Sequence, residues 1–213
     1  MNYFLSEFDI LDAIYEIRCP VLDYIMHFFT LLGEAGIFWI LLTLVLIIVP
    51  KTRRIGLSTA AAFLVEFICV NLTIKPLVKR TRPCIANTSR AIDTIISLPS
   101  GYSFPSGHSA AGFVVSTVIA KHNLKYGIIA LTASAISAFS RLYFYVHYPT
   151  DVLAGAMIGV LSGVIMDKVV MNSFKKHDEK IAAQKALAEG EQQQETEEAT
   201  AEEDTTAPLP QDV

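Results

Sequence analysis

The residues best suited to chemistry lie in one stretch, SRLYFYVHYPTD, which runs from Ser140 to Asp151. His147 and Asp151 are four positions apart, and the proline between them favours a helix start, so the carboxylate can bind one ring nitrogen of His147. The other ring nitrogen then keeps its lone pair, which makes His147 a candidate nucleophile. Arg141 would point elsewhere on one continuous helix, so we expect a helix break around residues 145–148. Taken alone, the pair could also be structural, with a buried histidine at a helix junction whose hydrogen bond to the carboxylate serves only the fold.

A second cluster, FPSGHS, covers residues 104–109 and directly precedes an apolar stretch that we expect to be helical. Ser106 is a natural helix-capping residue, and Gly107 lets the backbone approach a ligand closely. The free N–H groups at the start of that helix form an anion site, with His108 in the first turn. Alone, the same residues could be a serine cap with no further role.

A third cluster, KPLVKRTRP, covers residues 75–83. Lys75 and Arg82 are seven positions apart and return to nearly the same helix face, so both could meet one anion if the helix continues that far. Pro83 marks an expected helix end. The competing interpretation is that basic side chains at a helix end simply reach lipid headgroups. That interpretation suits three further cations, Lys79, Arg80 and Arg90.

The composition around these clusters is that of a membrane protein. Of the 213 residues, 52% are hydrophobic and 18% are charged, and the mean hydropathy is +0.43. A soluble domain carries about 25% charged residues. The net charge of −4 combines +5 on residues 1–177 with −9 on residues 178–213. Because the cations of the first part flank apolar segments, they indicate membrane topology and not nucleic-acid binding. The three cysteines, odd in number and unpatterned, indicate neither a disulfide framework nor a zinc site.

Apolar segments separated by turns or charges predict an all-α, polytopic membrane helix bundle. A helix can cross the hydrocarbon of a membrane because its backbone N–H and C=O groups are hydrogen-bonded to one another. We expect an interfacial amphipathic helix within residues 1–19, a six-helix membrane domain over residues 20–176 and a disordered acidic tail over residues 177–213. The six expected spans are Val21–Leu32, Gly33–Val49, Ile55–Ile74, Ser106–Ala120, Tyr126–Val146 and Val152–Met166.

Cations in the short connections orient these spans. They lie between the second and third spans, between the fourth and fifth, and after the sixth, which predicts that those ends and both termini are cytoplasmic. The three clusters then face the outer side of a plasma membrane that the chain crosses several times. Cations on that disfavoured side call for a functional explanation, and an anionic ligand is the simplest one.

Other residues bear on packing and on the tail. Gly155, Gly159 and Gly163 repeat at every fourth position and predict close helix packing, within the molecule rather than between copies, although the oligomeric state stays open. The tail is too polar to fold by itself, and it either docks a cytoplasmic partner or merely solubilises the chain.

Two polar residues precede Lys75 on the same expected span. Glu66, nine positions before Lys75, falls on nearly the opposite helix face, which favours a structural hydrogen bond over a role in the site. Asn71, four positions before Lys75, is placed to orient the lysine.

The three clusters together resemble the type 2 phosphatidic acid phosphatase family, an integral-membrane group of lipid phosphatases. Its signature, K-x-x-x-x-x-x-R-P, P-S-G-H and S-R-x-x-x-x-x-H-x-x-x-D, is matched at every defining position. The resemblance covers residues 75–151 directly and, through the helix layout, about residues 20–170. Neither the N-terminal helix nor the acidic tail is part of it.

The resemblance implies hydrolysis of a phosphate ester or anhydride through a phosphohistidine, with no metal and no other cofactor. His147 would attack phosphorus, Asp151 would orient its ring, and His108 would protonate the leaving oxygen and then activate water. The phosphoryl oxygens would be held by five residues, Lys75, Arg82, Ser106, Gly107 and Arg141. Spread negative charge calls for such positioned cations and N–H donors.

The expected substrate is a lipid phosphate in the bilayer, and undecaprenyl diphosphate, phosphatidylglycerophosphate and phosphatidic acid remain open. From a different class, the chain could be a noncatalytic lipid-phosphate-binding scaffold that docks through its tail. Binding alone would need the cations but not His108, His147 and Asp151, which favours the enzyme.

Overall fold

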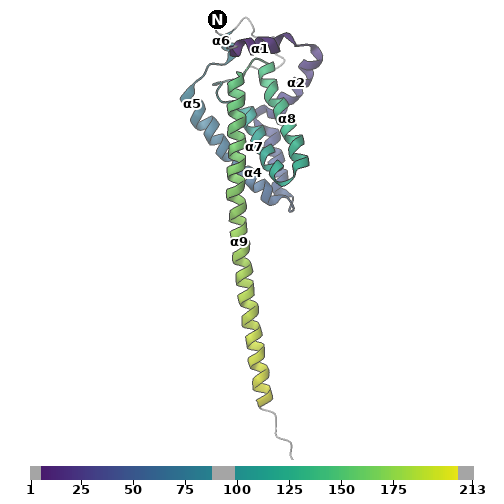
Figure 1. Cartoon of the computed structure of the whole chain (residues 1–213), viewed down its shortest axis with the longest axis vertical. Coiled ribbons are helices and arrows are strands. Elements are labelled where there is room, and N and C mark those ends of the chain that lie inside the picture. Colours follow the sequence, from purple (N-terminus) through teal and green to yellow (C-terminus); the bar gives the residue numbers. More distant parts are fainter. Residues whose placement is uncertain (1–5, 88–98, 206–213) are drawn as a thin grey trace, which may run out of the picture. The chain divides into compact units, whose positions relative to one another are not determined.

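The computed structural model describes residues 6–87 and 99–205, and every regular element among them is helical (Figure 1). This confirms the all-α class, while Arg90 lies outside the described residues. By internal contacts the chain forms two compact units, residues 1–170 and 171–213. The elements are α1 (Glu7–Glu16), α2 (Pro20–Gly33), η1 (Glu34–Gly36), α3 (Ile37–Ile48), α4 (Arg53–Phe67), η2 (Ile68–Ile74), α5 (Lys75–Val78), α6 (Pro83–Ala86), α7 (Gly107–His122), α8 (Leu124–Tyr143) and α9 (Pro149–Thr205).

A helix occupies each position where a span was expected, but six separate crossings are not confirmed. By length and hydropathy, two described segments could each cross a membrane, Arg53–Ala86 and Pro149–Gly190. The pair α2 and α3, bent by 52°, would together make a third. Gly36 lies at this bend with φ 69°, a left-handed conformation that glycine adopts without strain. The first two expected spans are therefore short helices joined at a bend.

Helix α7 forms the centre of the bundle, where it contacts α2, α3, α4 and α8. Its buried residues include two serines, two alanines and one glycine as well as Val114, Val115 and Val118. The valines pack with Trp39 of α3 and Ala62 of α4 in one hydrophobic cluster. A central helix of small residues lets its neighbours approach closely.

The glycine face of α9 packs against α7 within the molecule, as predicted. A methyl group on Gly159 would lie 2.5 Å from the carbonyl oxygen of Ala110, and one on Gly163 would lie 3.0 Å from that of Val114. Gly155 contacts the backbone of Ser106 in the same way. These contacts hold the start of α7 against the first turns of α9.

At the opposite end of the first unit, Asp167 of α9 connects three helices. Its carboxylate accepts a hydrogen bond from Ser58 of α4 at 2.8 Å and lies 2.7 Å from both Lys121 Nζ and His122 Nε2 of α7. Three helices therefore meet at one buried carboxylate. Residues 149–170 of α9 run from the Ser106 end of the bundle to this end.

Helix α1 lies at the end of the bundle where α9 begins. Ser6 caps it in a capping box with Asp9, and Leu11 is fully buried in a cluster with Tyr145 and Tyr148. The ring of Phe8 meets that of Tyr148 edge-on at 5.5 Å. This differs from the prediction that the N-terminus lies at the end opposite the clusters. The helices that follow α1 also differ from the prediction, because α2 and α3 form a pair bent by 52° that would count as one span where two were expected.

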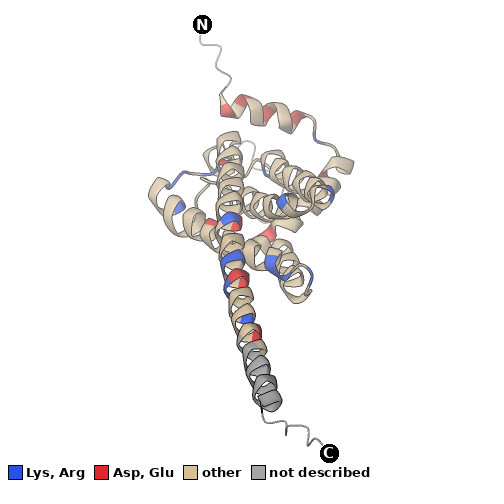
Figure 2. Ribbon diagram, turned by 60° about the horizontal axis from the view of Figure 1, so that its bottom comes forward, with Lys and Arg blue, Asp and Glu red and all other residues tan. Residues whose placement is uncertain are grey.

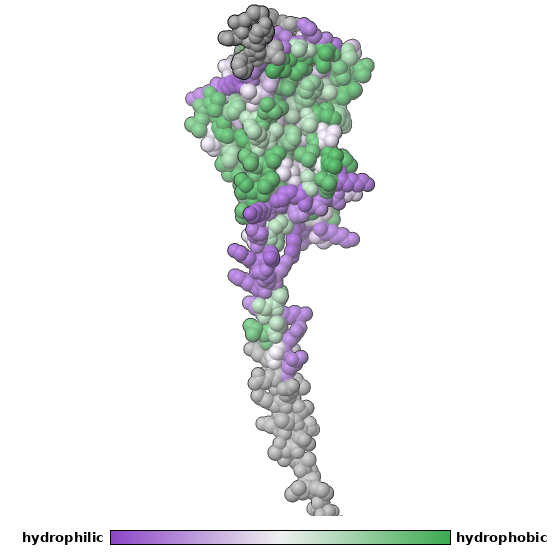
Figure 3. All heavy atoms as spheres, in the orientation of Figure 1, coloured by the Kyte–Doolittle hydropathy of each residue, from purple (hydrophilic) through white to green (hydrophobic). Residues whose placement is uncertain are grey.

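Hydrophobic side chains cover the outside of the helices in the first unit. Figure 3 shows them over most of the visible face, with hydrophilic side chains gathered toward the two ends of this body. Figure 2 shows acidic residues along α1 and few charges on the other helices of this unit. Exposed apolar residues on α3 include Ile37, Leu41, Leu44, Val45 and Ile48. So large an apolar surface is typical of contact with lipid.

In the second unit α9 continues as a helix to Thr205, so the predicted disordered tail is not confirmed. The segment is rich in Ala, Glu, Gln and Lys, which are strong helix formers. Lys175 lies 3.9 Å from Glu179 and Lys185 lies 3.6 Å from Glu189, each four residues later. Such pairs stabilise a solvent-exposed helix.

Candidate active site

His147 lies in the short connection between α8 and α9, where the predicted helix break is found. Helix α8 ends at Tyr143, Tyr145 has φ 58°, and α9 begins at Pro149. The backbone N–H groups of Val146 and His147 both donate to the carbonyl of Arg141, at 3.1 and 3.3 Å. This tight connection turns His147 back toward the end of α8.

The two ring nitrogens of His147 have different partners. Nδ1 lies 3.4 Å from Oδ2 of Asp151, and Nε2 lies 3.1 Å from Nη1 of Arg82. Because a guanidinium only donates hydrogen bonds, Nε2 must offer a lone pair, and the ring proton belongs on Nδ1 beside the carboxylate. This is the tautomer that a nucleophilic histidine requires.

The surroundings of His147 also keep its ring neutral. Burial lowers the pKa of His147, and the nearby cations Arg141 and Arg82 lower it further, against the opposing effect of Asp151. The side chain is 3% exposed. The ring therefore holds its lone pair at neutral and mildly acidic pH.

Asp151 is held by more partners than the sequence indicated. Oδ2 accepts hydrogen bonds from the backbone N–H of Tyr148 at 2.9 Å and from the hydroxyl of Ser103. Oδ1 accepts from Nη1 of Arg80 at 2.7 Å. Ser103 and Arg80 were missed as site residues; for Arg80 a basic residue on the disfavoured membrane side was the only signal.

Arg82, Arg141 and Lys75, the predicted phosphate-binding cations, all line one pocket. Arg82 and Arg141 are 4% and 2% exposed. Arg82 donates to the backbone carbonyls of Ser100, Gly101 and Val146, at 3.3, 3.0 and 3.1 Å. Arg141 is anchored to the Thr30 hydroxyl, while its buried Nε has no hydrogen-bond partner among residues 6–87 and 99–205.

Lys75 and Arg82 come together differently from the prediction. The helix ends at Val78, and Lys79 adopts φ 51°, so a turn and not a continuous helix face carries Arg82 to the pocket. Nζ of Lys75 donates to Oδ1 of Asn71 at 2.9 Å, which confirms that Asn71 orients the lysine.

The start of α7 contributes Gly107 and His108 to the pocket, whereas Ser106 is used for packing. The Ser106 hydroxyl caps the helix by accepting from the Ser109 backbone at 3.4 Å and from the Ser109 hydroxyl at 3.0 Å. Its own N–H donates to the Asp151 carbonyl at 3.0 Å. Ser106 is fully buried and is not among the pocket-lining residues, and its contact with phosphate stays a prediction.

His108 faces the pocket with Nε2 available. This buried atom has no hydrogen-bond partner in the part of the chain that the structure describes, and the Glu34 carboxylate lies 3.7 Å away. A methyl group on Gly33 would contact the His108 ring, so the bend between α2 and α3 packs directly on it. Glu34 at that bend carried no sequence signal for the site.

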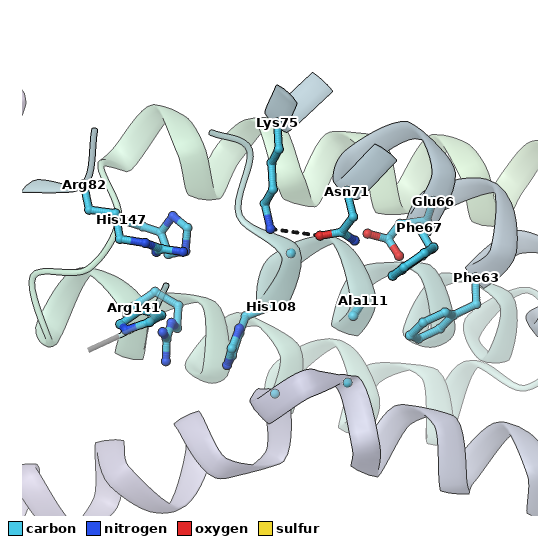
Figure 4. A pocket seen from close by; sticks show the side chains of 14 residues that line it. Phe63, Glu66, Phe67, Asn71, Lys75, Arg82, His108, Ala111, Arg141 and His147 are labelled. Atoms are coloured by element: carbon cyan, nitrogen blue, oxygen red, sulfur yellow. Dashed lines mark hydrogen bonds between the residues drawn. The ribbon is translucent and has the colours of Figure 1, made fainter. Parts of the chain in front are cut away.

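The pocket itself has a volume of about 340 Å³, and its lining changes in character along its length (Figure 4). Arg82, His147 and Arg141 lie at one end, with His108 next to them, and Lys75 and Asn71 follow. Glu66, Phe67 and Phe63 lie at the other end. The pocket thus passes from strongly basic through polar to aromatic.

Glu66 lines this pocket, so the prediction that it faces away from Lys75 is wrong. Seven of the eight residues between them, Ile68–Ile74, form the π-helix η2. A π-helix bonds residue i to i+5, so each residue turns by less than in an α-helix, and such segments recur at functional sites. The changed register brings Glu66 and Lys75 to the same pocket.

Comparisons with known proteins agree with this arrangement. A model of the PAP2 superfamily matches residues 51–175. The chain is 34% identical over 140 residues to decaprenylphosphoryl-5-phosphoribose phosphatase of Mycobacterium tuberculosis, covering 64% of this chain and 74% of that protein. It is 27% identical over 143 residues to an undecaprenyl-diphosphatase of Sulfolobus acidocaldarius, covering 67% and 68%.

A solved structure shares the fold as well. The chain is similar to the crystal structure of Aquifex aeolicus LpxE with a TM-score of 0.66 and 28% sequence identity, covering 79% of this chain and 98% of that one. The family match covers more than half of the chain and includes every residue of the three clusters. The chain therefore belongs to the PAP2 superfamily.

Proposed function

We propose that the protein is an integral-membrane lipid phosphatase that removes the terminal phosphate of a lipid phosphate or diphosphate through a phosphohistidine on His147. The observation that carries this proposal is the placement of His147 between Arg82, 3.1 Å from Nε2, and Asp151, 3.4 Å from Nδ1. The Nε2 lone pair then faces Arg82 in the pocket, and the ring proton on Nδ1 points to the Asp151 carboxylate. A site for binding alone has no need of such a nucleophile.

In the first step, His147 Nε2 attacks phosphorus, and the bond from phosphorus to the leaving oxygen breaks. His108 supplies the proton that the leaving oxygen takes up, and Asp151 stabilises the cationic ring of His147. In the second step, His108 accepts a proton from water, which attacks the phosphohistidine and releases phosphate. Lys75, Arg82 and Arg141 neutralise the developing charge, so the mechanism assigns no step to a metal ion.

The shape of the pocket supports a lipid substrate. At its aromatic end the pocket shares Phe63 and Phe67 with an apolar groove of about 260 Å³ between α3 and α4. The rest of that groove is lined by Ile40, Thr43, Leu44, Ile47, Ala60 and Leu64. A phosphate at the basic end would leave the hydrocarbon chain in this groove, facing the bilayer. Undecaprenyl diphosphate, phosphatidylglycerophosphate and phosphatidic acid all fit this description.

We place the protein in the plasma membrane with the pocket on the extracytoplasmic side. The cations Lys51, Arg53 and Arg54 and the Lys121–Asp167 end of the bundle would lie in the cytoplasm, in keeping with the positive-inside rule. Counting the bent pair of α2 and α3 once, the chain would cross five times, through that pair, α4 with η2, α7, α8 and α9. Helix α1 would then lie on the outer surface beside the site.

The test is phosphate release by the detergent-solubilised protein from a panel of lipid phosphates and diphosphates. We expect release from at least one of them, and undiminished release in EDTA because side chains supply the charge neutralisation. Binding of the lipids without release would indicate the noncatalytic scaffold instead. Loss of activity in EDTA that magnesium restores would contradict the proposed chemistry.

A further inference from the structure

Glu66 is a buried acid that the proposed reaction does not use. It is 2% exposed, it lines the pocket, and its Oε1 has no hydrogen-bond partner among the residues described. Buried polar atoms are nearly always hydrogen-bonded in native proteins, because leaving one unpaired is costly. An unpaired carboxyl oxygen in a residue that lines a ligand pocket therefore indicates that a bound ligand supplies the donor to this carboxyl group.

Asn71 completes a pair of complementary groups beside Glu66. Lys75 can only donate hydrogen bonds, so the atom of Asn71 that it contacts at 2.9 Å must be the amide oxygen. The amide NH₂ group is then left for another partner, and Figure 4 shows it on the side of Glu66. The pocket wall here offers one acceptor, the Glu66 carboxyl, and one donor, the Asn71 amide.

A hydroxyl group matches this pair, because it donates one hydrogen bond and accepts others. An additional phosphate matches it poorly, since ionised phosphate oxygens only accept and would face the acceptor oxygens of Glu66. The position of Glu66 and Asn71 along the pocket also fits a hydroxyl group of the leaving alcohol. Glu66 and Asn71 lie beyond His108, which protonates the leaving group, and before Phe63, where the apolar groove begins.

We propose that Glu66 and Asn71 are specificity-determining residues that bind a hydroxyl group of the leaving alcohol. The preferred substrate is then a lipid phosphate whose phosphate is attached to a hydroxylated unit, a polyol or a sugar, and a polyprenyl diphosphate is a poorer one. This inference rests on the proposed lipid phosphatase activity and narrows its substrate class.

The experiment uses two substrates that differ in one hydroxyl, lysophosphatidic acid and its 2-deoxy analogue. We expect the wild-type protein to prefer the hydroxylated lipid by at least about tenfold in kcat/KM, the loss that one unpaired buried group produces. Because this preference is measured on the unmodified protein, it tests the proposal even if a variant fails to fold. Farnesyl diphosphate is the third substrate, and we expect it to be used less well than lysophosphatidic acid.

Three variants test whether Glu66 causes the preference for the hydroxylated lipid. In Glu66→Leu the preference for the hydroxylated lipid should fall to near unity, and use of farnesyl diphosphate relative to lysophosphatidic acid should rise. Glu66→Gln keeps a carbonyl acceptor and should retain most of the preference. Thr73→Val removes a polar group from the same π-helix at an exposed position, and it should leave the preference as in the wild type.

Two results would overturn the inference. One is a wild-type protein that uses both lipids equally well, and the other is a Glu66→Leu variant that loses activity on both by the same factor, as a purely structural residue would. Either can occur while phosphate is still released, which leaves the proposed function standing. No release from any of the three substrates would instead count against the proposed function itself.

Discussion

The guanidinium of Arg80 lies 2.7 Å from the carboxylate of Asp151, although 71 positions separate the two residues in the chain. The same guanidinium pairs with Glu7 of α1 and stacks 3.8 Å from the centre of the Tyr148 ring. Asp151 thus presents Oδ2 to His147 and Oδ1 to Arg80. Arg80 is a positioning residue, which holds the carboxylate that in turn holds the nucleophile.

Replacing Arg80 with Gln should lower kcat by roughly tenfold or more, because a hydrogen bond between charged groups contributes about 1.5–3 kcal/mol. KM should change little, since Arg80 does not line the pocket. The rates are measured by phosphate release. Lys79→Gln, which removes the neighbouring exposed cation, is the matched control and should leave kcat unchanged. Equal effects of the two variants would indicate general attraction of anionic lipids.

The contact between α1 and the site should weaken at low pH, because the carboxylate of Glu7 becomes protonated. Partial burial alone would raise the pKa of Glu7, but hydrogen bonds from Thr150 and the charge of Arg80 lower it below the ordinary value of 4.5. A lowered pKa means that the contact stabilises the fold fully above pH 4.5 and loses that contribution as the pH falls through the lowered value.

Spin labels at the exposed positions Ile10 and Lys79 would report this as a lengthening and broadening of the distance between them below pH 4.5. In Glu7→Gln, we expect the broad distribution already at neutral pH. A distance that stays constant in acid, or in the variant, would show that the apolar contacts of Leu11 and Phe8 alone hold α1 in place.

Removing the nucleophile should abolish turnover. His147→Ala is expected to lower kcat by roughly a thousandfold or more, as for loss of a catalytic nucleophile elsewhere. Acid-labile, base-stable phosphorylation of the protein, seen in wild type after rapid quenching with labelled substrate, should disappear. His177→Ala, at an exposed position of α9, is the control for loss of a histidine. Turnover retained by His147→Ala would exclude His147 as the nucleophile.

The glycine face of α9 should be sensitive to a single methyl group. Gly159→Ala would bring its Cβ to 2.5 Å from the Ala110 carbonyl oxygen, and such overpacking destabilises by about 1–3 kcal/mol. Thermal unfolding in detergent measures the change. Gly190→Ala, in the same helix with nothing within 4 Å of the new methyl group, should be neutral or slightly stabilising. A Gly159→Ala variant as stable as the wild type would show that α7 and α9 can separate at no cost.

Local pattern was enough to predict much of this protein. The membrane composition, the helix positions, the break before His147 and the contact of Asn71 with Lys75 all depend on residues within a few positions of one another. Helix periodicity and capping fix such relations before any tertiary contact forms. The three clusters were also identified from spacing, and the fold brings most of their residues to one pocket.

Other features were decided only by the tertiary structure. Arg80 and Ser103 reach Asp151 across 71 and 48 positions, and no local pattern encodes a partner at that distance. Glu66 enters the pocket because η2 departs from the α-helical angle on which the sequence argument depended. The bend at Gly36 joins α2 and α3 into a pair that would count as one span where two were expected, and α1 lies at the end of the bundle where Asp151 lies.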